Sequence, residues 1–266
     1  MSAAMTESIG DIAVSRQDGV VTLTLDRAPN NTLDKPTARG LTEFLRGASD
    51  DPTVRSILIT GTGRRFCTGA DIGDDGSPKR TTVDYRFGHE MYTQLFTALW
   101  EIEIPVVSAV NGTVAGVGWM LALLADLVVA DADARWVHVF TRRGMVPHAG
   151  DPYFLSRIIP LHRLSELALL SDPVSSTTLA EWGVVNRAVA ADDVMPTAME
   201  FASRLAAGPT KSLGVTKQLY RRALDSALPA ALADERAAVA VISTTHDRAE
   251  GMTSFIEGRD ANFTGQ

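Results

Sequence analysis

Two glycine-bearing turns are the parts of this sequence with the clearest capacity for chemistry. One is Arg-Arg-Phe-Cys-Thr-Gly-Ala-Asp-Ile, at 64–72, and the other is Asn-Gly-Thr-Val-Ala-Gly-Val-Gly-Trp-Met, at 111–120. Each follows a strand-like apolar run, and the second leads into an apolar helix-like run. Brought side by side, the two turns would offer backbone N–H groups to one anionic oxygen. Such an arrangement stabilises an enolate or a tetrahedral oxyanion.

The elements that must position these turns alternate between strand and helix, which predicts an α/β fold class. From about residue 195 the composition becomes helical and alanine-rich, punctuated by Pro209, Pro229 and Gly251. An Asp18-Gly19 turn predicts a hairpin between the first two strands. The predicted strands are 12–14, 20–25, 57–60, 106–110, 127–130 and 136–139, and the predicted helices are 34–48, 82–100, 118–125 and 153–159.

Four further runs accompany the two turns. They are Leu-Asp-Arg-Ala-Pro-Asn-Asn-Thr-Leu at 25–33, Arg-Gly-Met-Val-Pro at 143–147, Glu-Trp-Gly-Val-Val-Asn-Arg-Ala-Val at 181–189, and Glu-Gly-Met-Thr-Ser-Phe-Ile-Glu-Gly-Arg at 250–259. In this order they resemble the crotonase (enoyl-CoA hydratase/isomerase) superfamily, and the likeness covers most of the chain. The resemblance implies a crotonase-type spiral of ββα units over 1–195, with a C-terminal helical trimerisation region over 196–266. It also implies a homotrimer or a dimer of trimers.

The same resemblance assigns roles to particular residues. The backbone N–H groups of Ala70 and Val117 correspond to the two oxyanion donors, although the family usually has glycine where Val117 stands. Arg27 is expected near the phosphates of coenzyme A, with Thr68, Ala70 and Ile72 around its adenine. Coenzyme A is then part of an acyl-CoA thioester substrate, and no tightly bound cofactor is expected.

Two residues depart from the pattern of the family's hydratases. Those enzymes carry two glutamates that position water and move protons, and the matching positions here are Met120 and Phe140. Neither side chain can exchange a proton or hold a water molecule. Ordinary enoyl-CoA hydration is therefore not expected, and an isomerase-like reaction fits better. The alternative is a non-catalytic acyl-CoA binder or carrier whose pocket has an apolar floor.

His148 is the strongest candidate for an acid or base. Some isomerases and a dehalogenase of the family have a catalytic aspartate at the matching position, and imidazole gains and loses a proton near neutral pH. The alternative is a polar loop residue. Asp151 precedes Pro152 and an apolar run, which predicts a helix N-cap. We expect His138 to be a packed strand histidine, and His89 to lie about one turn too early to reach the pocket.

The sequence argues against several other classes of protein. A net charge of −7 argues against nucleic acid as the main partner. The longest apolar run, 120–130, contains Asp126 and is too short to cross a bilayer. Glu90 follows His89, but Thr93 stands where a zinc motif needs its second histidine, so no metal is expected. Neither a complete G-x-G-x-x-G nor a G-x-S-x-G motif is present.

The single cysteine and the N-terminal sequence bear on location. Cys67 is the only cysteine, which suits a reducing compartment and makes an intrachain disulfide impossible. The first nineteen residues lack an apolar run flanked by basic residues, so no signal peptide is expected. A cytoplasmic protein is the resulting prediction. Cys67 itself is expected to be a small buried packing residue.

Overall fold

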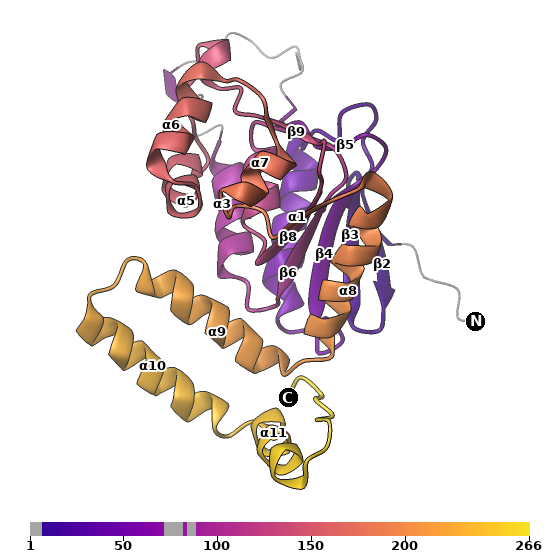
Figure 1. The fold of residues 1–266 in the computed structure, drawn as a ribbon, viewed down its shortest axis with the longest axis vertical. Helices are drawn as coiled ribbons and strands as arrows, with labels where there is room; N and C mark the ends of the chain where they lie inside the picture. The colour runs from indigo at the N-terminus through magenta and orange to yellow at the C-terminus, as the bar shows by residue number, and fades with distance from the viewer. Residues whose placement is uncertain (1–6, 72–81, 84–88) are drawn as a thin grey trace.

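A seven-stranded sheet runs through the centre of the molecule (Figure 1). The computed structural model describes residues 7–71, 82–83 and 89–266. The strand order is β1-β2-β3-β4-β6-β8-β11, antiparallel as far as β3 and parallel beyond it. The strands are β1 (Glu7–Ile9), β2 (Ile12–Gln17), β3 (Val20–Leu25), β4 (Ser56–Gly61), β6 (Val106–Val110), β8 (Leu127–Asp131) and β11 (Arg187–Val189). The predicted hairpin between β2 and β3 is confirmed, and both turn residues have positive φ.

A second sheet of four strands has the order β10-β9-β7-β5, in which β5, β7 and β9 are parallel. Its members are β5 (Arg65–Cys67), β7 (Thr113–Ala115), β9 (Arg135–Val137) and β10 (Val174–Ser175). The chain passes from the large sheet to the small one three times, from β4 to β5, β6 to β7 and β8 to β9. A helix follows each pass, so the chain forms the predicted spiral of ββα units, and the α/β class is confirmed.

Helices cover both faces of the large sheet. The helices of the described residues are α1 (Lys35–Ala48), α3 (Glu90–Glu101), α4 (Gly118–Leu123), α5 (Asp151–Ile158), α6 (Leu161–Leu170), α7 (Ser176–Glu181), α8 (Val194–Ala206), α9 (Thr210–Ala223), α10 (Leu228–Ile242) and α11 (His246–Glu257), with short 3-10 turns at Thr141–Arg143 and Ala191–Asp193. The main core lies between the sheets, α1, α3 and α4. On the other face, α8 packs against Val107 and Val129 through Ala198, Ala202 and Ala206, whose small side chains permit close approach. The predicted boundary at 195/196 therefore falls within a helix that packs on the sheet, and the two-domain division stays a prediction.

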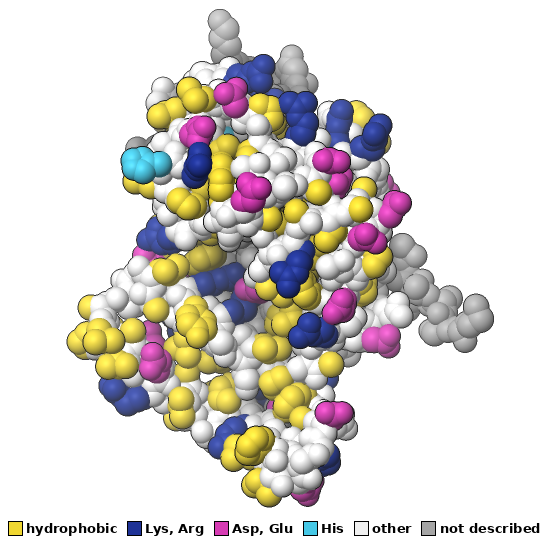
Figure 2. Space-filling model, viewed as in Figure 1, with side chains coloured by type: hydrophobic (Ala, Val, Ile, Leu, Met, Phe, Trp, Pro, Cys, Tyr) yellow, Lys and Arg dark blue, Asp and Glu magenta, His cyan; other side chains and the backbone are white. Residues whose placement is uncertain are grey.

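Helices α9 and α10 form an antiparallel pair below the sheets in Figure 1. Two cations of α9 hold it to the core: Lys217 Nζ lies 2.6 Å and Arg221 Nη2 lies 2.9 Å from the carboxylate of Asp126. Burial lowers the pKa of the Lys217 ammonium to about 8, against the attraction of Asp126. Every side chain of α10 stays at least partly exposed, and apolar side chains gather on this part of the surface (Figure 2).

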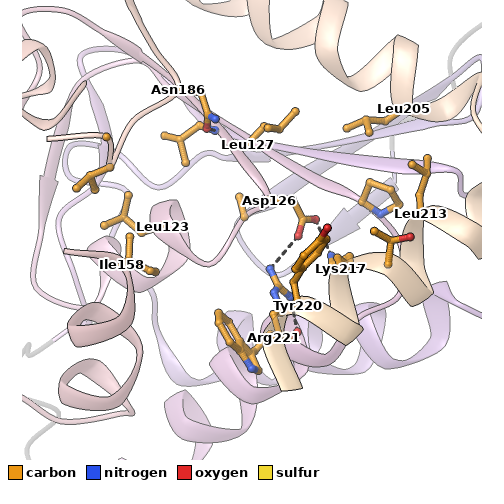
Figure 3. Close-up of a pocket in the computed structure, with 17 residues that line it drawn as sticks. Leu123, Asp126, Leu127, Ile158, Asn186, Leu205, Leu213, Lys217, Tyr220 and Arg221 are labelled. Atoms are coloured by element: carbon orange, nitrogen blue, oxygen red, sulfur yellow. Dashed lines mark hydrogen bonds and ion pairs between the residues drawn. The ribbon is translucent and has the colours of Figure 1, made fainter. Parts of the chain in front are cut away.

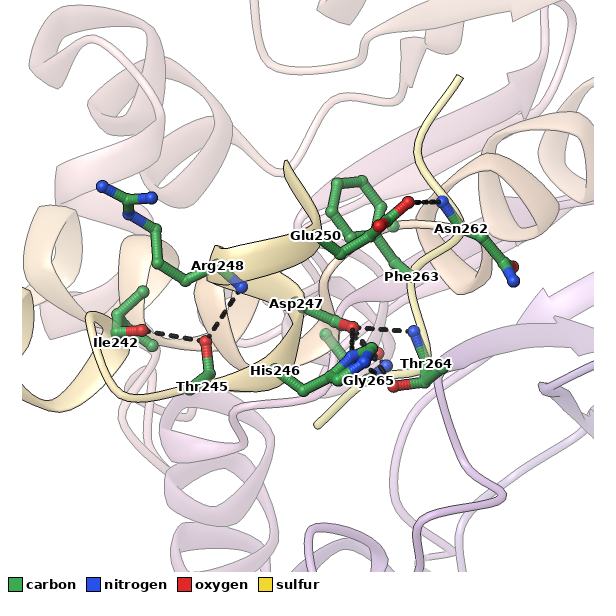
Figure 4. Close-up of polar contacts among 12 residues, drawn as sticks. Ile242, Thr245, His246, Asp247, Arg248, Glu250, Asn262, Phe263, Thr264 and Gly265 are labelled. Carbon is green, nitrogen blue, oxygen red and sulfur yellow. Dashed lines mark hydrogen bonds and ion pairs between the residues drawn. The ribbon is translucent and has the colours of Figure 1, made fainter. Parts of the chain in front are cut away.

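The segment after α11 folds back and binds that helix (Figure 4). Asp247 accepts hydrogen bonds from the backbone N–H groups of Thr264 (2.8 Å) and Gly265 (2.7 Å). Gly251, expected to interrupt a helix, instead lies inside α11. A Cβ there would lie 3.4 Å from the Phe263 ring, an ordinary van der Waals contact, so the tail packs against this part of α11. No helix within the described ranges has the length and apolar character needed to cross a membrane.

Candidate active site

The ends of three parallel strands bring the predicted site residues to one edge of the small sheet. The register pairs Cys67 with Val114, and Ala115 with Val137. The residues that follow β5, β7 and β9 therefore emerge together, because parallel strands end at the same edge. They are 68–71, 116–117 and 138–140.

The two glycine-bearing turns touch each other at Gly69. This residue has φ +110°, a conformation that side chains strongly disfavour. A Cβ on Gly69 would lie 3.2 Å from the Ala115 carbonyl oxygen and 3.7 Å from the Val117 nitrogen. Glycine is required here for both reasons, and the two turns lie side by side as predicted.

The backbone N–H groups of Ala70 and Val117 are not used by the neighbouring bridge and helix. Leu33 donates its N–H to the Gly69 carbonyl (2.9 Å) and accepts from the Asp71 N–H (2.8 Å). In such a parallel bridge the N–H of Ala70, between those two residues, faces the opposite side. Val117 is the N-cap of α4, whose helix does not use its N–H. Among the described residues, neither N–H has a backbone acceptor.

Among the residues predicted to contact coenzyme A, Thr68 anchors the first turn. Its hydroxyl donates to the Asn30 carbonyl at 2.9 Å, which ties the turn to the 25–33 segment. Ala70 is half-buried at the turn. Ile72 lies outside the described residues. The expected contacts of these residues with adenine stay predictions.

Arg27 lies among three carboxylates that sequence reasoning did not connect with it. Its Nη1 is 2.7 Å from both Asp11 and Asp34, and its Nη2 is 2.5 Å from Asp71. The ion pair with Asp71 ties the first turn to the 25–33 segment. The Arg27 side chain keeps about a third of its surface exposed, at 32%. Its contact with coenzyme A phosphates stays a prediction, and such a phosphate would have to share Arg27 with these carboxylates.

His148 is half-buried and presents one ring nitrogen for chemistry. Its Nδ1 lies 3.0 Å from the Val146 carbonyl oxygen. A carbonyl only accepts, so Nδ1 is the protonated nitrogen in this contact, and Nε2 carries the lone pair. The ring also stacks on that of His89, with centroids 4.0 Å apart. His89 contacts His148 from the N-cap of α3, and the expectation that it lies too early to reach the acyl pocket stays a prediction. No sequence signal links these two distant histidines.

The two positions predicted to match the glutamates of the family's hydratases are buried. Met120 is fully buried, and Phe140 is 2% exposed. The Phe140 ring lies between two imidazoles, with centroids 5.0 Å from His138 and 4.8 Å from His148. An apolar floor therefore separates the half-buried histidine from the deeper one.

Asp151 was predicted to cap a helix, and this prediction is wrong. The N-cap of α5 is Gly150, with φ +87°, and Asp151 is the first helical residue. Its Oδ2 instead accepts a hydrogen bond from His138 Nε2 at 3.0 Å, between side chains that are 2% and 0% exposed. His138 is packed as expected, but it lies just beyond β9 and has a carboxylate partner. The end of β9 and the start of α5 bring the pair together, and no sequence motif linked His138 with Asp151.

Two residues beside the turns are part of the core. The burial of Cys67 is confirmed, and it raises the pKa of the thiol to about 12. Trp119 is fully buried, and its ring packs against Trp136 with centroids 5.1 Å apart.

A cavity of about 530 Å³ opens elsewhere, between the core and α9 (Figure 3). Its wall includes Leu123, Ile158 and Tyr220, with the Asp126 ion pairs at one side. Within the part of the chain that the structure describes, its lining is distinct from the predicted site residues. The same part holds no group of three or more His, Cys, Asp or Glu residues that could bind a metal ion.

Comparison with known proteins shows likeness along nearly the whole chain. Residues 15–266 match the family model described as enoyl-CoA hydratase/isomerase. The 1,2-epoxyphenylacetyl-CoA isomerase of Escherichia coli (strain K12) is 34% identical over 253 residues, covering 94% of this chain and 97% of the relative. The 2,3-dehydroadipyl-CoA hydratase of that strain is 31% identical over 261 residues, covering 97% and 100%. The solved enoyl-CoA hydratase of Polaromonas sp. JS666 has a TM-score of 0.88 and 28% identity, covering 95% and 99%.

Proposed function

Because the chain belongs to the enoyl-CoA hydratase/isomerase family, we propose that it binds an acyl-CoA thioester and stabilises the enolate of its acyl group. The observation that carries this proposal is the contact between the two turns at Gly69, beside two backbone N–H groups that have no backbone acceptor among the described residues. The N–H groups of Ala70 and Val117 both donate to the thioester oxygen. Each donor contributes about 3 kcal/mol of transition-state stabilisation in a site that excludes water.

The reaction that fits the site best is a proton transfer of the isomerase type. Nε2 of His148 takes a proton from the acyl chain, and the electron pair moves through the enolate onto the thioester oxygen. The imidazolium then returns a proton to a different carbon, which moves the double bond. Met120 and Phe140 provide no group to hold a water molecule for addition. One base therefore serves both steps.

The relatives' names include both reaction types. The Escherichia coli relative that is 34% identical is called an isomerase, and the one that is 31% identical is called a hydratase. The isomerase reading rests instead on His148 and on the apolar residues at positions 120 and 140. A non-catalytic acyl-CoA binder is the second candidate, and the same apolar floor favours it.

We also propose that the chain assembles as a trimer or a dimer of trimers. Helix α10 carries exposed apolar side chains at Leu228, Leu232 and Val239, spaced so that they lie along one side. Such a surface is costly to leave in water and is typical of an interface.

The test is incubation with a panel of 2-enoyl- and 3-enoyl-CoA esters in deuterated water, followed by mass spectrometry. Deuterium at the α or γ carbon that is lost in His148→Ala is the expected result. The matched control is His162→Ala, at an exposed histidine of α6, which should keep wild-type exchange. Addition of a whole water molecule would contradict the isomerase reaction. Tight binding without label or added water would support the carrier instead.

A further inference from the structure

The cavity beside α9 has no part in the mechanism above. Its volume of about 530 Å³ lies within the range of small-molecule sites (Figure 3). Buried aliphatic side chains such as Leu123 and Val184 form its inner wall. Thr216 and Tyr220 also line it and are exposed, so they belong to its rim. The cavity therefore has room for a ligand and is open to solvent.

One side of this cavity carries two cations and a single carboxylate. Lys217 Nζ and Arg221 Nη2 lie 2.6 Å and 2.9 Å from the carboxylate of Asp126, and all three residues line the cavity. No other described residue of the lining carries a charge at neutral pH. Glu103, whose charge also acts on Lys217, lines a different cavity. The wall therefore has a surplus of one positive charge.

Asp126 leaves part of the hydrogen-bonding capacity of the two cations unused. Lys217 Nζ donates to Asp126 and to the Ile104 carbonyl (2.9 Å), which leaves one of its three hydrogens without an acceptor among the described residues. Arg221 donates to Asp126 and to two backbone carbonyls, which leaves two of its five N–H hydrogens in the same state. Each side chain keeps 10% of its surface exposed. Hydrogens of both cations therefore remain for an anionic group in the cavity.

The ammonium of Lys217 is only partly compensated by Asp126. Burial lowers its pKa to about 8, and Arg221 lowers it further, against the attraction of Asp126. A second anion beside Lys217 would favour the charged form of the ammonium and raise this pKa. Binding of an anion near pH 8 should therefore be accompanied by uptake of a proton.

The chemistry of the lining defines the ligand that fits it. A carboxylate brings one negative charge, which matches the surplus, whereas a phosphate monoester brings about two. The aliphatic wall, with Leu123, Ile158 and Leu213, favours a hydrocarbon chain over a polar one. A neutral alcohol would cover this wall and leave the surplus charge uncompensated. A free fatty carboxylate provides both parts.

We propose that the cavity between the core and α9 binds a free fatty carboxylate, with its head group at Lys217 and Arg221 and its chain along the aliphatic wall. This site is separate from the candidate active site, and its occupation does not depend on the proposed function. Because the bound molecule contacts both α9 and the core, it should also raise the thermal stability of the protein.

Two substitutions test the head-group site and the cavity separately. Lys217→Met removes one cation and keeps a side chain of similar length, while Arg221 still pairs with Asp126. Thr216→Trp narrows the cavity from its exposed rim and leaves both ion pairs in place. Lys211→Met is the matched control, because it removes an exposed cation of α9 that lines the other cavity. Thermal unfolding of each variant shows whether it is folded.

Calorimetry of the full-length protein with hexanoate, octanoate, decanoate and decanol measures the binding. In wild type and Lys211→Met, we expect the affinity to rise about fourfold for each added methylene until the chain fills the cavity. Decanol should bind about tenfold more weakly than decanoate. Thr216→Trp should weaken the binding of every carboxylate, and Lys217→Met should lose most of the preference for decanoate over decanol.

The dependence on pH reports whether Lys217 acts through its charge. Wild-type affinity for decanoate should fall as the pH rises through about 8, because the ammonium loses its proton, and Lys217→Met should not show this fall. Equal binding of decanoate and decanol by wild type, or decanoate binding that survives both site variants, overturns the proposal. Absence of binding by wild type also overturns it. A lower mass of Thr216→Trp in light scattering would then assign the cavity to a contact between copies of the chain.

Discussion

At the scale of single residues, the contact between the two turns depends on a glycine, which has no side chain. Gly69 lets two turns meet at a spacing that a methyl group would block, and its φ of +110° is open to glycine at little cost. The chemical groups at this contact are backbone N–H groups, which any residue except proline supplies. This explains how valine can stand at position 117.

Gly69→Ala is expected to damage the site far more than a glycine substitution in open space. The new Cβ would meet the Ala115 carbonyl at 3.2 Å and strain φ, so stability should fall by about 1–3 kcal/mol. The turns would separate, and turnover should fall about a hundredfold. The control is Gly63→Ala, which also has positive φ (+66°) but has nothing within 4 Å of the new Cβ. Chemical denaturation and initial rates measure both, and equal losses of activity would contradict a special role for Gly69.

At the scale of elements, how much the sequence predicts depends on the length of the periodic pattern. The large-sheet strands β4 and β6, which precede the two turns, and helix α4 after the second turn were predicted because each has several residues of apolar repeat. The small-sheet strands β5 and β7 were missed, because three residues are too few to show an alternation. The likeness to a known family supplied the spiral, and periodicity alone could not.

The contacts within the site were less predictable than its backbone. Ala70 and Val117 follow from their turns, and those turns meet. The carboxylates around Arg27, the stacking of His89 on His148 and the bond from His138 to Asp151 are all long-range. Each joins elements that only the folded sheets bring together, so neither spacing nor motif predicts it.

Acid should release the segment after α11 from that helix, because protonation of Glu250 removes one of the charges that hold it. Glu250 accepts from Asn262 N–H at 2.7 Å and pairs with Arg259 at 2.6 Å, and these contacts lower its pKa to about 2 from 4.5, chiefly through Arg259. The charged form is favoured in the folded state, so its stabilisation is complete above about pH 4.5 and is lost as the pH falls towards 2. In Glu250→Gln, the backbone amides of residues 260–266 should therefore exchange their hydrogens with solvent faster than in wild type near neutral pH.

Hydrogen–deuterium exchange of the tail peptide, with both proteins compared at each pH, measures this difference. The two proteins should become alike as the pH approaches 2. The control is Glu257→Gln, which removes another Arg259 partner at 2.6 Å but leaves the Glu250 contact with Asn262 in place. A difference between wild type and Glu250→Gln that is independent of pH would show that charge is not the cause.

At the scale of the whole molecule, the distribution of apolar surface separates the spiral from the C-terminal helices. Most large aliphatic side chains of the spiral lie in two buried clusters, although Leu161 and Leu169 of α6 are exposed. Helix α10 buries none of its side chains and leaves Leu228, Leu232 and Val239 between 40% and 71% exposed. In the proposed assembly, a second copy of the same chain covers this face of α10.

Leu232→Asp is expected to weaken the proposed assembly. A carboxylate placed in an apolar interface would have to be desolvated without a partner, so the oligomer should dissociate towards a monomer. Light scattering after size-exclusion chromatography measures the mass, and circular dichroism checks the fold. Leu161→Asp, at an exposed leucine of α6, is the matched control and should leave the mass unchanged. A monomeric wild-type protein would contradict the proposed assembly outright.

The burial of Cys67 gives the protein a built-in chemical reporter. It is the only thiol in the sequence, and burial raises its pKa to about 12, so alkylating reagents find almost no thiolate in the native state. The Gly118 backbone packs directly on its carbonyl, below the second turn. We expect Cys67 to react only when the structure around it opens. The rate of its alkylation therefore reports how often the two turns separate. The native protein therefore offers no reactive thiol to maleimide dyes. A cysteine introduced elsewhere can carry a single fluorophore without removal of Cys67.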